Sequence, residues 1–105
     1  MVSEIIWSSL AIRTYGDNID YLEKEWSSKE VNNFIKATER KLAILKEFPE
    51  TGFSAKQDHY LRRTLIGKRI ILIYRYKPRK GNIELLRFFN SWQNPEKLKR
   101  NPKAT

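Results

Sequence analysis

The stretch "YLRRTLIGKRIILIYRYKPRKGNIELLRFF", residues 60–89, decides the fold of this chain. It contains three runs rich in β-branched and aromatic residues, in which the character of the side chain alternates with the period of a strand. Turn-forming residues separate the runs at "GK" (67–68) and "KGN" (80–82). Three strands joined by two short turns predict an antiparallel β-meander.

The middle run predicts which face of this sheet is buried. Its even-numbered residues from Ile70 to Tyr76 are all apolar or aromatic, so this face should pack on a second layer. The odd-numbered face carries cations at both ends. In the first run Arg62 and Arg63 are adjacent and point to opposite faces. One of them must therefore approach the second layer, with its guanidinium paired or reaching solvent.

The residues before the meander supply that second layer. Residues 3–7, "SEIIW", predict a short strand. Apolar residues then recur every three or four positions from Trp7 to Trp26, which predicts one apolar face of a helix. Gly16 lies inside this stripe and indicates a close helix contact or a slight bend.

A second helix follows directly. Ser27 and Glu30 have the spacing of a capping box, which predicts its start. Phe48-Pro49 predicts its end, because the residue before a proline is disfavoured in helical geometry. The expected fold is α+β: an N-terminal strand and an antiparallel helical hairpin packed on an antiparallel β-meander. We assign one domain to residues 1–98 and a basic, frayed tail to residues 99–105.

Composition excludes several classes of site. The chain has 105 residues and no cysteine, so disulfides and thiolate zinc sites are ruled out and a reducing cytoplasm is favoured. The longest apolar run, Ile70–Tyr74, is far too short to span a membrane, and the N-terminus lacks the basic region of a signal peptide. We expect no metal, no cofactor and no membrane partner.

The charge is unevenly distributed along the chain. The net charge is +9, but residues 1–55 hold seven Lys and Arg against nine Asp and Glu, whereas residues 56–105 hold fourteen against three. This asymmetry predicts an anionic partner on the C-terminal half, either nucleic acid, an acidic protein segment, or both. The alternative is a basic surface that is merely solvated.

No nucleophile motif or phosphate-binding loop appears in the sequence. Cleavage of RNA by attack of its 2′-OH would need only a base, cations for the phosphate and a proton donor. The candidate catalytic residues for such a reaction are His59, Arg62 and Arg75. For His59 the alternative is a solvated loop side chain, and for Arg75 it is an ordinary surface arginine.

A second set of residues is a candidate for partner binding. An arginine of the first run lying beside Arg75 would give a surface that binds phosphate or carboxylate. Trp92, after the last run, either covers the core or offers an exposed face for stacking. The candidate partner-binding residues are Arg63, Arg69, Lys77, Arg87 and Trp92.

The order and spacing of these features resemble the RelE/ParE superfamily of toxins from bacterial type II toxin–antitoxin modules. The resemblance covers residues 1 to about 98. It is carried by the order of a strand, a helical hairpin, the "FPETG" loop (48–52) and a basic meander. Particular residues also match, namely Ile19, Tyr21-Leu22, Trp26, Phe34, Leu42, Leu45, Arg62, "IYR" (73–75) and "NPEKL" (94–98).

The resemblance implies a toxin held inactive, in a hetero-oligomer, by a cognate antitoxin with an acidic, partly disordered segment. Members of the superfamily either cleave mRNA on the ribosome or inhibit DNA gyrase. The third-strand arginine of the cleaving members falls at Ile71, their arginine after the last strand near Trp92, and their C-terminal tyrosine near Leu98. Arg62 matches a basic position, but most of the cleaving set is absent.

Three functions are therefore carried forward. The first is a ParE-like toxin that binds a cellular target such as gyrase. The second is a ribosome-dependent mRNA endoribonuclease with a rearranged site. The third is an attenuated, non-toxic partner in a repressor complex. The sequence "NSW" (90–92) also departs from the basic residues that ParE-like members favour after the last strand.

Overall fold

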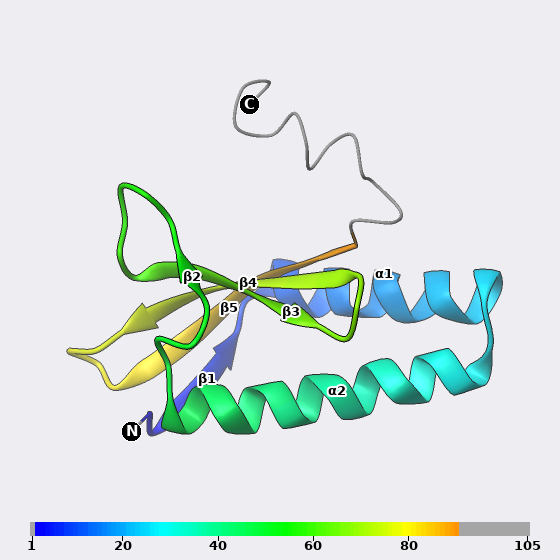
Figure 1. Ribbon diagram of the computed structural model, residues 1–105, viewed down its shortest axis with the longest axis horizontal. Coiled ribbons are helices and arrows are strands. Elements are labelled where there is room, and N and C mark those ends of the chain that lie inside the picture. The colour runs from blue at the N-terminus through cyan, green and yellow to red at the C-terminus, as the bar shows by residue number, and fades with distance from the viewer. Residues whose placement is uncertain (1, 91–105) are drawn as a thin grey trace.

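Residues 2–90 form seven elements in the order strand, two helices and four strands (Figure 1). The computed structural model describes residues 2–90. Strand β1 (Glu4–Trp7) precedes helices α1 (Ser9–Glu25) and α2 (Ser28–Glu47). Strands β2 (Phe53–Ser54), β3 (Leu61–Ile66), β4 (Ile70–Lys77) and β5 (Asn82–Asn90) follow. The fold is α+β, as the sequence predicts.

All five strands belong to one sheet in the order β1-β5-β4-β3-β2. Strands β3, β4 and β5 pair antiparallel, which confirms the predicted meander. The sheet as a whole is mixed, because β1 pairs in parallel with the first half of β5, from Glu4 opposite Asn82 to Trp7 opposite Leu85. The two-residue strand β2, which pairs with β3, is an addition that the sequence did not predict.

The helices begin and end where the local sequence predicts. The Ser27 side chain accepts a hydrogen bond from the Glu30 N–H at 3.4 Å, and α2 ends at its C-cap Phe48, before Pro49. Of the two alternatives predicted for Gly16, the close helix contact is wrong, because a Cβ atom there would meet nothing within 4 Å, and the slight bend stays a prediction. Neither helix in residues 2–90 is long and apolar enough to cross a membrane.

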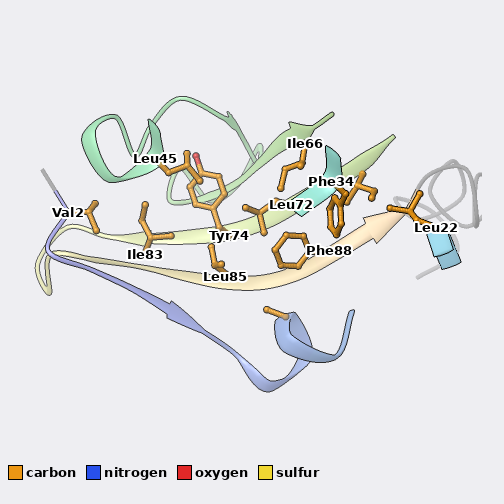
Figure 2. Packing of buried hydrophobic residues seen from close by; sticks show 12 residues of the cluster. Val2, Leu22, Phe34, Leu45, Ile66, Leu72, Tyr74, Ile83, Leu85 and Phe88 are labelled. Atoms are coloured by element: carbon orange, nitrogen blue, oxygen red, sulfur yellow. The ribbon is translucent and has the colours of Figure 1, made fainter. Parts of the chain in front are cut away.

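The core lies between the helices and the even-numbered face of β4, as predicted. Leu72 and Tyr74 are fully buried in a cluster with Phe34 and Leu45 of α2 (Figure 2). Each such side chain contributes roughly 1.5–3 kcal/mol through removal of apolar surface from water. Tyr15 of α1 contacts the rings of both Phe34 and Phe88 of β5. Both helices therefore cover the same face of the sheet.

The second half of β5 is protected at its edge by side chains of α1. Strand β1 ends opposite Leu85, so no strand within residues 2–90 lies beside residues 86–90 on that side. The Phe88 N–H donates to Thr14 Oγ1 at 2.9 Å, and Asn18 Nδ2 donates to the Phe88 carbonyl at 3.2 Å. Thr14 and Asn18, which are both buried, thus take the place of a neighbouring strand. They satisfy the backbone N–H and carbonyl of Phe88 and block the edge to pairing with another strand.

Candidate functional site

The second face of the sheet, here called the open face, has no helix packed on it among residues 2–90. Alternation along the strands and the strand register place apolar and cationic side chains together on it. Most of its residues are half-buried or exposed, namely Ile6, Phe53, Arg63, Leu65, Ile71, Ile73, Arg75, Lys77, Glu84 and Arg87. Phe89, which lies opposite Ile71 on the same face, is buried. A mixed surface of this kind is typical of a binding face.

Two arginines flank one isoleucine across the open face. In register, Arg63 of β3 lies opposite Ile73 of β4, and Ile73 lies opposite Arg87 of β5. The two arginine Cα atoms are therefore about 10 Å apart, twice the spacing between strands. The Arg87 guanidinium lies 5.1 Å from the Phe89 ring centre. Among residues 2–90 neither arginine forms an ion pair.

The other two cations of the open face are already paired. Arg75 Nη1 lies 2.6 Å from Asp58 Oδ2, and Lys77 Nζ lies 3.1 Å from Glu84 Oε1. The hydrogen bond from Arg75, helped by one from the Tyr60 N–H, holds the pKa of the Asp58 carboxyl below its usual value. An arginine of β3 does share the face of Arg75, as the sequence allowed, and that arginine is Arg63.

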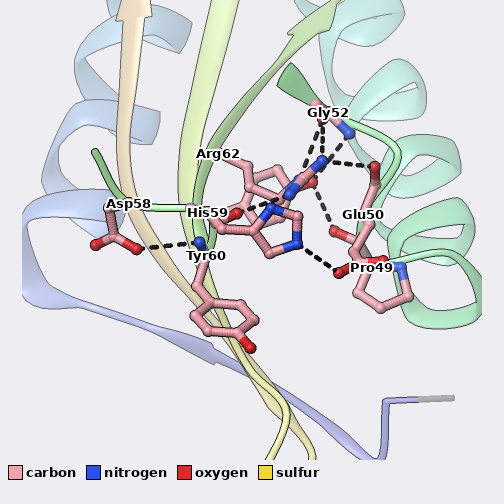
Figure 3. A network of polar contacts seen from close by, with 8 residues as sticks. Pro49, Glu50, Gly52, Asp58, His59, Tyr60 and Arg62 are labelled. Carbon is pink, nitrogen blue, oxygen red and sulfur yellow. Dashed lines mark hydrogen bonds and ion pairs between the residues drawn. The ribbon is translucent and has the colours of Figure 1, made fainter. Parts of the chain in front are cut away.

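Arg62 lies on the opposite face and acts as a structural anchor (Figure 3). Its side chain is buried, and its guanidinium donates to three backbone carbonyls. Nε and Nη2 both donate to Gly52 O, at 3.2 and 2.9 Å. Nη2 also donates to Glu50 O at 3.0 Å, and Nη1 donates to His59 O at 2.7 Å. These contacts use Arg62 to fix the loop around residues 49–52, instead of presenting it to a substrate.

Tyr74 of β4 also holds the loop around residues 49–52. Its hydroxyl donates to the Pro49 carbonyl at 2.8 Å and accepts from the Gly52 N–H at 3.2 Å. Burial raises the pKa of this hydroxyl, which therefore stays protonated and able to donate. Gly52 is required sterically, because a Cβ atom there would lie 2.4 Å from the Arg63 carbonyl oxygen.

His59 forms a pair with an acid that sequence reasoning did not find. His59 Nε2 lies 3.1 Å from Glu50 Oε2, and both side chains are exposed (Figure 3). A histidine oriented by a carboxylate is a common arrangement for general-base catalysis. The two residues are nine positions apart in an irregular loop, so no periodic signal in the sequence could have paired them.

Of the other predicted binding residues, Arg69 does not lie on the open face. Arg69, in the β3–β4 turn, places its guanidinium 4.7 Å from the ring centre of Trp26, at the end of the helical hairpin. This contact lies beside a cavity of about 430 Å³ between that turn and the helices. Trp92 lies outside the described residues.

Residues 2–90 contain no group of three side chains that could hold a metal ion. The described site consists of two parts. One is the open face with Arg63 and Arg87, and the other is the loop region with His59 and Glu50. The ion pair between Arg75 of the open face and Asp58 of the loop joins them. No protein-family model matches the chain, and a search of curated proteins finds no similar sequence.

Proposed function

We propose that this chain is the toxin of a type II toxin–antitoxin module of the RelE/ParE superfamily, and that it acts by binding a cellular target such as DNA gyrase. The fold is compatible with such a toxin: a strand, a helical hairpin and a basic meander follow in the expected order. The observation that carries the binding mechanism is the open face, where Arg63 and Arg87 flank an apolar strip.

The state of two of the three cleavage candidates, Arg62 and Arg75, also supports binding over catalysis. Arg62 is buried and committed to three backbone carbonyls, and Arg75 is paired with Asp58. Arg62 would have to give up backbone contacts to reach a phosphate, and the charge of Arg75 is already partly neutralised by Asp58. An antitoxin with an acidic, amphipathic segment would complement the open face, because cations and apolar side chains alternate there.

Target binding is tested by capture and by supercoiling. Tagged protein should recover gyrase from lysate, and excess protein should reduce gyrase-dependent supercoiling. Arg63→Glu combined with Arg87→Glu should abolish both effects. Lys29→Glu combined with Lys36→Glu, on the exposed surface of α2, gives the same change of net charge and should leave both effects intact. Normal supercoiling at excess wild-type protein, with no gyrase recovered, refutes this mechanism.

The salt dependence of affinity distinguishes whether the open face binds RNA or an acidic antitoxin segment. Affinity for RNA, governed by phosphate contacts, should fall steeply between about 50 and 200 mM salt. Binding to an antitoxin should survive better, because Ile71 and Ile73 add apolar contacts that salt does not screen. A small acidic reading frame beside that of this chain would identify the antitoxin.

The His59–Glu50 pair favours one second candidate, an mRNA endoribonuclease. His59 would accept the proton of the 2′-OH, and Glu50 would orient the imidazole. Expression should then cause translation-dependent mRNA cleavage, detected by primer extension. His59→Asn should abolish this cleavage, and Lys56→Gln in the same loop should not. If inducing the toxin alone leaves growth, mRNA and supercoiling unchanged, the chain is instead the attenuated partner.

A further inference from the structure

A hollow of about 590 Å³ opens where α2 ends, on the helix side of the sheet and away from the open face. Three aromatic side chains and two carboxylates line it. The rings belong to Phe48, Tyr60 and Tyr76, and the carboxylates to Glu47 and Glu50. None of the functions considered above uses this hollow as a binding site.

The rings form an exposed aromatic corner. The centroids of Tyr60 and Tyr76 are 6.2 Å apart, and their planes meet at 75°. Phe48 is 63% exposed and Tyr60 is 43% exposed. Clustered exposed aromatic rings are unusual on a surface that has no partner, and the faces of such rings attract cations.

The local electrostatics also select a cation. The hollow lies at the C-terminal end of the 20-residue helix α2, whose last residue is Glu47. Helix C-termini carry partial negative charge from unpaired carbonyl groups, which adds to the charge of the two carboxylates. No Lys or Arg is among the residues of 2–90 that line the hollow, although the chain has a net charge of +9. His59 lies beside it and contacts both Glu50 and the ring of Tyr60.

We propose that this hollow binds the side chain of a lysine or arginine on a partner polypeptide. The hollow is many times larger than an ammonium group, since a water molecule occupies about 30 Å³. Pro49 and Pro78 provide apolar walls on which the methylene stem of a long side chain can lie. This partner segment is basic, so it differs from the acidic segment proposed for the open face, and the inference does not depend on the toxin assignment.

The test is chemical-shift mapping on the ¹⁵N-labelled full chain. The probes are the N-acetyl N-methylamides of lysine, arginine and norleucine, each at about 10 mM, which would nearly saturate a site with a Kd of about 1 mM. Lysine and arginine probes should shift the amides of Glu50, Thr51, Tyr60 and Tyr76. The norleucine probe has a similar stem without charge and should shift none of them.

Variants then separate the aromatic corner from general surface effects. Tyr60→Leu should weaken binding of the lysine probe about two- to fivefold, the loss expected for one exposed cation–π contact. Adding Glu47→Gln to Tyr60→Leu should weaken binding of the lysine probe further. Tyr21→Leu, which removes an aromatic ring from α1 outside this hollow, is the matched control and should leave affinity unchanged. Tyr60 is chosen because its exposed ring can be removed without opening the core.

Three results would overturn the proposal. Equal shifts from norleucine would make the hollow a plain apolar surface. An absence of shifts at about 10 mM would mean that it is not a cation site of useful affinity. Binding of spermidine, without binding of the lysine or arginine probe, would assign it to free polyamines and exclude a partner side chain.

Discussion

Replacing Arg62 by methionine should destabilise the fold strongly, because it removes the anchor of the loop around residues 49–52. The variant keeps the apolar stem but loses four hydrogen bonds to three carbonyls. The Gly52 carbonyl is buried and would be left unsatisfied, at a cost of about 1–3 kcal/mol. The Glu50 and His59 carbonyls are partly buried, so water can replace some of their bonds. The total expected loss is about 3–5 kcal/mol.

The assay is urea unfolding followed by circular dichroism and tryptophan fluorescence. With a denaturant slope of about 1.5 kcal/mol/M, the midpoint should fall by about 2–3 M. Arg62→Lys keeps the charge, but its single ammonium group cannot span the three carbonyls, so it should recover less than half of the loss. Tyr74→Phe removes the other anchor of the same loop and should cost about 1–2 kcal/mol.

A midpoint for Arg62→Met within about 0.3 M of the parent would refute this reasoning, since it corresponds to less than about 0.5 kcal/mol. If Arg62→Met lost mRNA-cleaving activity while its stability stayed unchanged, Arg62 would again be a candidate catalytic residue. The double variant Arg62→Lys with Tyr74→Phe gives an internal check. Because both residues hold one loop, their effects should not be additive.

Three further predictions concern other parts of the structure. Asn18→Leu should cost about 1–3 kcal/mol in urea unfolding, because the buried Phe88 carbonyl loses its donor, whereas a cost below about 0.5 kcal/mol would show that the edge needs no cap. Gly52→Ala should lower the melting temperature through its clash with the Arg63 carbonyl, while Gly16→Ala, with open space around it, should stabilise by about 0.5–1 kcal/mol. The bond from Arg75 places the folded-state pKa of Asp58 below its unfolded value, near 3.9, so this stabilisation is present above that pH and is lost as the pH falls through the folded pKa. Asp58→Asn should therefore flatten the acid part of the stability curve, and an unchanged curve in urea titrations from about pH 6 to pH 2 would contradict this.

Much of the secondary structure could be predicted because its causes are local. Ser27 with Glu30, and Phe48-Pro49, fix the ends of α2 through contacts within a few residues. The alternation in β4 correctly predicts that Leu72 and Tyr74 are buried. The site was less predictable. Arg62 and Arg63 had to lie on opposite faces, but alternation alone could not say which one faces the helices.

The sequence by itself determined the helical hairpin, the antiparallel meander, its buried face and the basic character of the C-terminal half, because periodicity, caps and charge are properties of neighbouring residues. Tertiary structure alone decided the parallel pairing of β1 with β5, the edge contacts of Asn18 and the commitment of Arg62 to backbone carbonyls. It also brought Glu50 to His59. These contacts join residues through irregular loops or across most of the chain. They arise only when packing closes the loops and leaves buried polar groups that need partners.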